Sequence, residues 1–281
     1  MARVHGVQLN IAWEAKAGNH RRVRELLEDR GLAAGDLVVL PEMFATGFSM
    51  RVGAVAERDG GETERFLADF ARRHRIYIVG GIAARSAADP RKGRNLALAV
   101  GPNGEVLGRY AKRHPFSYAG ETSRYEAGEA YLVFGWRGFT VAPFICYDLR
   151  FPESFRRTAC LGANLFLVIA NWPAARREHW RILLQARAIE NQAYVVGVNR
   201  VGSDPEHAYA GDSLAVGPRG ELLADAGGGE TVMTAELDLQ SLNEYRRSFP
   251  ALRDMADGFR YAQAARAATC RRTRKQKGRS P

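Results

Sequence analysis

Cysteine is scarce in this sequence, and long hydrophobic runs are absent. The 281 residues include three cysteines, Cys146, Cys160 and Cys270, which are far apart. They are too few for a disulfide framework or a four-thiolate zinc site, so we expect a reducing, cytoplasmic location. The longest apolar run, 165–170, is much shorter than the roughly 20 residues that span a bilayer. Since residues 1–12 also lack the pattern of a signal peptide, we expect neither secretion nor a membrane partner.

The net charge of +10 is concentrated at one end of the chain. A segment this polar and basic has no apolar surface to bury, so we predict that residues 263–281 form a disordered tail. No aromatic residues are interleaved with its charges, and we expect no specific nucleic-acid partner. A protein that binds nucleic acid through this tail is the alternative from another functional class. The six basic residues without any acidic neighbour are Arg271, Arg272, Arg274, Lys275, Lys277 and Arg279.

The body of the chain has the composition of a globular protein, with 46% hydrophobic and 26% charged residues. Apolar runs alternate with helical periodicity, which predicts a layered α/β fold. Asn103-Gly104 lies between two apolar runs and predicts a hairpin with a type I′ turn, so the sheet should be mixed. No linker divides the chain, and we predict one domain over residues 1–262. The expected strands are 4–13, 36–40, 76–84, 96–100, 105–109, 139–146, 164–170, 193–200, 213–216 and 221–224, and the expected helices are 20–30, 62–75, 153–161 and 178–191.

Several familiar catalytic motifs are missing. The sequence contains no G-x-x-x-x-G-K-[ST], no H-E-x-x-H and no G-x-S-x-G, and no strand leads into G-x-G-x-x-G. Cys146 stands out instead, because an apolar run ends there and the polar segment 147–153 begins. A thiol at the carboxyl end of a strand is available to a ligand, and the following turn offers backbone N–H groups to an oxyanion. From position alone, a buried structural cysteine is the competing interpretation.

Two other predicted strand ends are followed by candidate catalytic residues. Glu42 follows the short apolar strand 37–40, where a carboxylate could act as a base or could simply cap a helix. Lys112 follows the strand at 106–110 and is one of five lysines among 41 basic residues. An ammonium is a compact charge suited to stabilising an oxyanion, although a solvated surface role is its ordinary function. Glu42, Lys112 and Cys146 together form a possible base, electrostatic stabiliser and nucleophile.

The segments 40–44, 112–114 and 146–153 resemble, in order and separation, the three signature blocks of the nitrilase superfamily of carbon–nitrogen hydrolases. The resemblance extends from Val4 to Arg260. It implies a four-layer α-β-β-α sandwich with mixed sheets and a homodimer or higher homo-oligomer. It also implies a second catalytic glutamate, and Glu121 matches that position, with Glu126 and Glu129 as nearby competitors.

Within the superfamily, the segments 171–176, 191–194 and 199–204 are most similar to the omega-amidase branch, which includes the 2-oxoglutaramate amidases. This resemblance implies hydrolysis of the omega-amide of a short 2-oxo dicarboxylic acid. We expect no metal or organic cofactor, because no cluster of His, Cys and carboxylates has ligand spacing and the thiol already provides the nucleophile. We expect the small-molecule amide to contact Tyr147, Arg150 and Trp172. The guanidinium of Arg150 would pair with the substrate carboxylate, or else form a structural ion pair with Asp148 or Glu153.

Two further interpretations stay open. A superfamily member of other specificity, such as a carbamoylase or a different amidase, would carry the same catalytic blocks. A cysteine–histidine hydrolase would take its base from His114 or His179, but it would leave Glu42 and Lys112 without a role, and the papain-type signature is missing.

Overall fold

The computed structural model describes residues 1–255. The predicted domain boundary at residue 262 and the predicted tail at 263–281 lie outside this range. Two six-stranded mixed sheets form the centre of the molecule. Within residues 1–255, no helix is long and apolar enough to cross a membrane.

The first sheet has the strand order β14-β1-β2-β3-β4-β5. Strands β1, β2 and β3 are parallel, and the flanking pairs are antiparallel. The edge strand β14 is the last strand in the sequence, and it pairs with β1, the first strand in the sequence, over seven residues. The bounds are β1 Ala2–Gln8, β2 Leu37–Val39, β3 Tyr77–Arg85, β4 Gly93–Val100, β5 Val106–Ala111 and β14 Thr231–Leu237.

The second sheet repeats this design in the order β13-β12-β9-β8-β7-β6. Strands β7, β8 and β9 are parallel, and the outer pairs are antiparallel. A separate two-stranded ribbon, β10–β11, lies beside it. The bounds are β6 Phe134–Trp136, β7 Phe139–Ile145, β8 Leu165–Ala170, β9 Tyr194–Asn199, β10 Val201–Ser203, β11 Ala208–Ala210, β12 Leu214–Val216 and β13 Leu222–Asp225.

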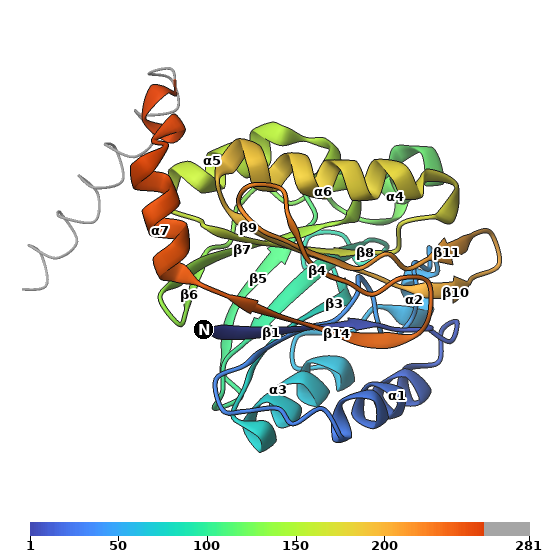
Figure 1. The fold of residues 1–281 in the computed structure, drawn as a ribbon. Helices are drawn as coiled ribbons and strands as arrows, with labels where there is room; N and C mark the ends of the chain where they lie inside the picture. Colours follow the sequence, from blue (N-terminus) through green and yellow to red (C-terminus); the bar gives the residue numbers. More distant parts are fainter. Residues whose placement is uncertain (256–281) are drawn as a thin grey trace, which may run out of the picture.

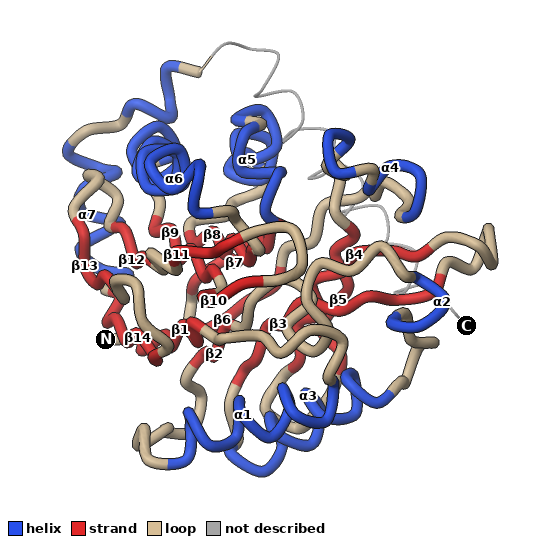
Figure 2. Tube along the Cα trace, turned by 90° about the vertical axis from the view of Figure 1, so that its right-hand side faces the viewer, coloured by secondary structure: helices blue, strands red, loops and turns tan. Residues whose placement is uncertain are grey.

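Helices cover the outer face of each sheet, which gives four layers (Figure 1). Helices α1 and α3 lie under the first sheet, and α5 and α6 lie over the second; the end-on view in Figure 2 shows the same order. The predicted four-layer α-β-β-α sandwich is therefore confirmed. The bounds are α1 Lys16–Glu28, α2 Val52–Val55, α3 Glu62–His74, α4 Glu121–Arg124, α5 Pro152–Cys160, α6 Arg177–Asn191 and α7 Leu239–Ser248, with short 3₁₀ turns η1 Ser117–Ala119, η2 Cys146–Arg150, η3 Ala174–Arg176 and η4 Ala251–Asp254.

The hydrophobic core lies mainly between the two sheets. Strands β7 and β8 are buried along almost their whole length because helices cover one face and the other sheet covers the opposite face. This double burial explains why their sequences are continuous apolar runs instead of alternating patterns. A second cluster fills the space between the first sheet and the helices α1 and α3. The sandwich thus fixes the positions of the strand ends on which the chemistry depends.

Most predicted elements agree with the structure to within a few residues, with two corrections. The strand expected over 4–13 ends at Gln8, and beyond it Asn10 forms an isolated bridge with Val201. The hairpin between β4 and β5 is confirmed, but its predicted type I′ turn is wrong because Asn103 keeps a negative φ. Gly104 alone is left-handed, at φ +82°, and its N–H donates to Gly101 O at 2.9 Å. The side chain of Glu105 accepts from the Asn103 N–H at 2.9 Å and stabilises this alternative turn.

Gly81 in β3 allows the end of β2 to pack closely. A Cβ atom at Gly81 would lie 2.4 Å from Met43 N and 2.5 Å from Glu42 Cα. We expect Gly81→Ala to lower the free energy of unfolding by about 1–3 kcal/mol, because backbone atoms must move to make room. Gly53→Ala, in open space in the short helix α2, is the matched control and should be neutral or slightly stabilising. Urea denaturation of both variants tests this, and equal stabilities would contradict the prediction.

Candidate active site

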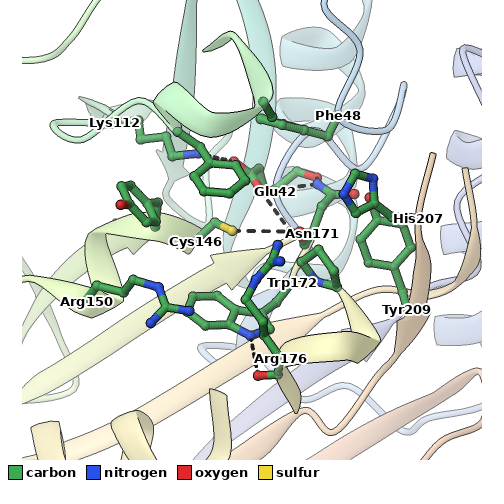
Figure 3. Close-up of a pocket in the computed structure, with 14 residues that line it drawn as sticks. Glu42, Phe48, Lys112, Cys146, Arg150, Asn171, Trp172, Arg176, His207 and Tyr209 are labelled. Carbon is green, nitrogen blue, oxygen red and sulfur yellow. Dashed lines mark hydrogen bonds and ion pairs between the residues drawn. The ribbon is translucent and has the colours of Figure 1, made fainter. Parts of the chain in front are cut away.

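Glu42, Lys112 and Cys146 follow the carboxyl ends of β2, β5 and β7, and the sandwich brings these three ends together (Figure 3). All three residues line one pocket. The side chains of Glu42 and Lys112 are 0% and 1% exposed. Charged groups are rarely buried so completely unless they are paired.

The ammonium of Lys112 lies between two carboxylates. Its Nζ donates to Glu42 Oε1 at 3.0 Å and to Glu121 Oε2 at 2.8 Å. Glu121 is the first residue of α4 and is fully buried. Its Oε2 also accepts from the Phe116 N–H at 2.5 Å, which holds the loop between β5 and α4. The structure thus brings Glu121 to the site, whereas, within residues 1–255, neither Glu126 nor Glu129 forms an ion pair with Lys112.

Asn95 joins the two carboxylates from the opposite side. Its Nδ2 donates to Glu42 Oε1 at 2.7 Å and to Glu121 Oε1 at 2.9 Å, inside the buried part of β4. Sequence reasoning missed this residue. The available signal was an amide placed directly before the apolar run 96–100, where a buried polar group needs partners.

Burial and neighbouring charges together shift the pKa values of Lys112 and Cys146. Burial alone would lower the pKa of Lys112, but the charges of Glu121 and Glu42 outweigh it, so the pKa is raised and the ammonium stays charged. Burial raises the pKa of the Cys146 thiol well above its usual value, and Glu42 adds to the rise while Lys112 opposes it. The resting cysteine is therefore protonated at neutral pH, and a base must remove its proton before it can attack.

The backbone at Cys146 makes a sharp turn. Cys146 has φ +46°, a left-handed conformation that is uncommon for a residue with a side chain, and it begins η2. Asp148, fully buried, supports this turn by accepting from the Ile145 N–H at 3.1 Å and the Tyr110 hydroxyl at 2.7 Å. The turn directs Sγ into the pocket, where it donates to Asn171 O at 3.8 Å (Figure 3).

Asn171, directly after β8, connects the cysteine and the glutamate. Its backbone N–H donates to Glu42 Oε2 at 2.8 Å, and its Nδ2 donates to the Glu42 carbonyl oxygen at 2.7 Å. Sequence reasoning gave this residue no catalytic or positioning role. Because Glu42 belongs to the first sheet and Asn171 to the second, these bonds also fix the two sheets against each other at the site.

The empty space in the pocket, counted together with the solvent at its mouth, is about 460 Å³. The three residues expected to contact substrate, Tyr147, Arg150 and Trp172, all line it. Arg150 forms no ion pair with Asp148 or Glu153; its guanidinium lies 4.9 Å from the centre of the Trp172 ring, and its Nη2 is 3.2 Å from His179 Nδ1. The pocket also contains residues that sequence reasoning did not assign to it: Phe48, Phe116, Ala119, Pro173, Arg176, His207 and Tyr209.

The histidines of the cysteine–histidine alternative are engaged elsewhere. His114 Nδ1 is 2.7 Å from Asp148 Oδ1, and its ring stacks on Phe151. His179 Nδ1 contacts Arg150. The group beside the thiol is the carboxylate of Glu42, which favours the glutamate as the base. Within residues 1–255, no group of three or more His, Cys, Asp or Glu side chains could hold a metal ion.

A thiol at a strand end, with two carboxylates and an ammonium beside it in a four-layer sandwich, is the arrangement of the nitrilase superfamily. The model of the family described as carbon–nitrogen hydrolase matches residues 3–247. The chain therefore belongs to the carbon–nitrogen hydrolase family, and it is an amidohydrolase.

Known relatives are similar over most of their length. The chain is 43% identical over 253 residues to Omega-amidase YafV of Yersinia enterocolitica, covering 88% of this chain and 94% of the relative. It is 35% identical over 251 residues to the 2-oxoglutaramate amidase of Bacillus subtilis (strain 168), covering 89% and 95%. A solved structure of a CN-hydrolase superfamily protein from Xanthomonas campestris, with an arsenic adduct in its active site, aligns with a TM-score of 0.85 and 36% identity over 91% of this chain and 97% of that one.

The paired charges give a stability prediction. We expect Lys112→Met to lower the free energy of unfolding by about 3–5 kcal/mol, because it leaves two buried carboxylates without their ammonium. The control is Arg72→Met, which removes an exposed ion pair with Asp69 at 2.9 Å and should cost less than about 1 kcal/mol. Denaturant unfolding at neutral pH gives both values. Similar losses in the two variants would show that the buried cluster contributes no special stability.

Proposed function

We propose that this amidohydrolase cleaves the omega-amide of a short 2-oxo dicarboxylic acid, such as 2-oxoglutaramate or 2-oxosuccinamate, and releases ammonia. The observation that carries the proposal is the pocket itself: the Cys146 thiol beside the Glu42–Lys112 pair, with the guanidinium of Arg150 in the same wall. The names of the relatives, an omega-amidase and a 2-oxoglutaramate amidase, support this substrate class.

In the first half-reaction, Glu42 takes the proton from Cys146 Sγ as the sulfur attacks the amide carbon. The electron pair of the C=O bond moves to oxygen, and the Lys112 ammonium and the backbone N–H of Tyr147 stabilise the oxyanion. When the oxyanion collapses, the C–N bond breaks. The leaving nitrogen takes the proton from Glu42 and departs as ammonia, which leaves a thioester on Cys146.

In the second half-reaction, water replaces ammonia. Glu42 removes a proton from the water as its oxygen attacks the thioester carbon, and the C–S bond breaks after a second oxyanion. The thiolate recovers its proton from Glu42, and the carboxylic acid product loses its proton to solvent. Glu121 holds Lys112 and the Phe116 backbone in place through both steps. The same carboxylate thus alternates between base and acid, as microscopic reversibility requires.

The substrate carboxylate pairs with Arg150 in this proposal. Trp172 covers one face of its guanidinium, and Nη2 contacts His179 Nδ1 at 3.2 Å. The remaining N–H groups of the guanidinium are available to donate hydrogen bonds to a carboxylate. An amidase or carbamoylase of other specificity is the alternative, and it would use the same cysteine chemistry. The homodimer and the cytoplasmic location stay predictions.

The covalent step predicts an acyl adduct on Cys146. Intact-mass spectrometry of enzyme quenched during turnover should show a mass increase equal to the acyl group, because the thioester precedes hydrolysis. Cys146→Ala should lose both the adduct and the ammonia release. Peptide mapping provides the internal control, since the buried Cys160 should remain unmodified. Full turnover by Cys146→Ala, or an adduct on Cys160, would refute the mechanism.

Substrate class is tested by ammonia release from a panel of amides, carbamoyl compounds and nitriles. We expect 2-oxo dicarboxylic acid monoamides to be the best substrates, with Cys146→Ala as the blank. Arg150→Lys keeps the charge but loses the planar fork, so kcat/KM for these substrates should fall by roughly 10-fold or more. A neutral short amide should be affected much less. Equal losses for both substrates would mean that Arg150 has only a structural role.

A further inference from the structure

Arg176 is a second guanidinium in the wall of the catalytic pocket, and no part of the mechanism above uses it. It is the last residue of η3, in the connection between β8 and α6. The side chain is half-buried, and it lies with its Cζ atom 5.6 Å from the centre of the Phe116 ring. Because Phe116 belongs to the loop tied to Glu121, Arg176 reaches across the pocket from one wall to the other. Figure 3 shows its guanidinium directed into the pocket.

The guanidinium of Arg176 has no carboxylate partner among residues 1–255. None of its side-chain N–H groups donates to a protein acceptor there; only its backbone takes part in hydrogen bonds, to Pro173 and from Trp172. Its neighbours differ: Arg177 and Arg181 both bind Asp212 Oδ1, at 2.8 and 3.0 Å. The chain therefore neutralises the neighbouring arginines and leaves Arg176 available. A half-buried guanidinium with five unpaired donors calls for an anionic partner.

The catalytic carboxylates do not supply that partner. Glu42 and Glu121 are both paired with Lys112 and bridged by Asn95, so their oxygens are already bonded. An anion for Arg176 must therefore come from the molecule that enters the pocket. Arg150, in the same pocket, likewise has no carboxylate partner among residues 1–255, although its Nη2 contacts His179 Nδ1.

Trp172 links the two arginines. Its indole Nε1 donates to the carbonyl oxygen of Arg176 at 2.8 Å, and its ring lies under the guanidinium of Arg150. The tryptophan is itself fixed, because its backbone N–H donates to Asn199 Oδ1 at 2.7 Å and its side chain is buried. One rigid side chain thus contacts the guanidinium of Arg150 and holds the backbone from which the Arg176 side chain extends, and this preorganisation favours a specific anion site.

We propose that Arg176 is a specificity-determining residue that binds the substrate carboxylate together with Arg150. This inference rests on the proposed function, that the substrate is the monoamide of a dicarboxylic acid. Two guanidiniums bind the carboxylate that lies a few bonds from the amide carbon, while the amide group lies at Cys146. A neutral amide leaves both guanidiniums without an anionic partner in the pocket, and it is disfavoured for that reason.

The test compares wild-type enzyme, Arg176→Met and Arg176→Lys on 2-oxoglutaramate and on a neutral amide of similar length. We expect Arg176→Met to lower the ratio of kcat/KM for the acid over the neutral amide by roughly 30-fold or more, mainly through KM, as expected for loss of a buried charged partner. Arg176→Lys should recover part of this ratio because it keeps the charge but not the fork. Arg157→Met, an exposed arginine on α5 outside the pocket, is the matched control and should leave the ratio unchanged.

A binding measurement separates recognition from chemistry. In a Cys146→Ala background, calorimetry with the dicarboxylate 2-oxoglutarate should show binding that Arg176→Met weakens by a similar factor. The inference alone is overturned if the wild type prefers the acid but Arg176→Met keeps the same preference and the same affinity. If the wild type itself shows no preference for the acid, the proposed function fails and the inference with it. Should Arg176→Met not fold, Arg176→Lys in both assays gives the same decision.

Discussion

Two buried carboxylates share one buried ammonium, and the rest of the active site depends on this arrangement. Lys112 holds Glu42 and Glu121 together, and through them it fixes the end of β2, the start of α4 and the loop between β5 and α4. Burying these charges separately would be costly, so the cluster forms only when all three segments are in place. It leaves a net negative charge beside the thiol. Burial, together with this charge, raises the pKa of Cys146 and keeps the thiol protonated at rest. The Glu42 carboxylate is also the base that activates the thiol in the proposed mechanism.

The chemistry also requires both sheets. Glu42 and Lys112 come from the first sheet, Cys146 and Asn171 from the second, and the bonds between Asn171 and Glu42 cross the boundary. The core between the sheets is built from strands that are buried on both faces. The packing of many apolar side chains therefore sets the position of one sheet relative to the other. The polar bonds at the edge then refine that position. Catalytic geometry is in this sense a product of the whole sandwich.

The sequence predicted the strand ends well because polarity changes abruptly there. Glu42 and Cys146 each follow an apolar run, and the layered α/β pattern was sufficient to expect them at a ligand-binding edge. Asn95 could not be found in this way, because it lies within a strand and its role depends on two carboxylates distant in sequence. Tyr209 lies in β11 and His207 in the loop before it, and the three-residue strands of this ribbon are too short for a periodic signal. The type I′ turn failed because a side-chain bond from Glu105 stabilises a different backbone conformation at Asn103.

The nucleophile and part of the pocket wall come from different segments of the chain, which has a consequence for the evolution of such enzymes. The nucleophile lies at the end of β7, whereas Trp172 and Arg176 lie in the connection that follows β8. Substitutions of Trp172 or Arg176 alter the shape and charge of the pocket wall, whereas Asn171, in the same connection, contacts the thiol and its base. Acyl preference can therefore diverge among descendants of one ancestor while the bond-breaking apparatus is inherited intact. In a scaffold of this kind, the substrate preference can change while the catalytic residues stay the same.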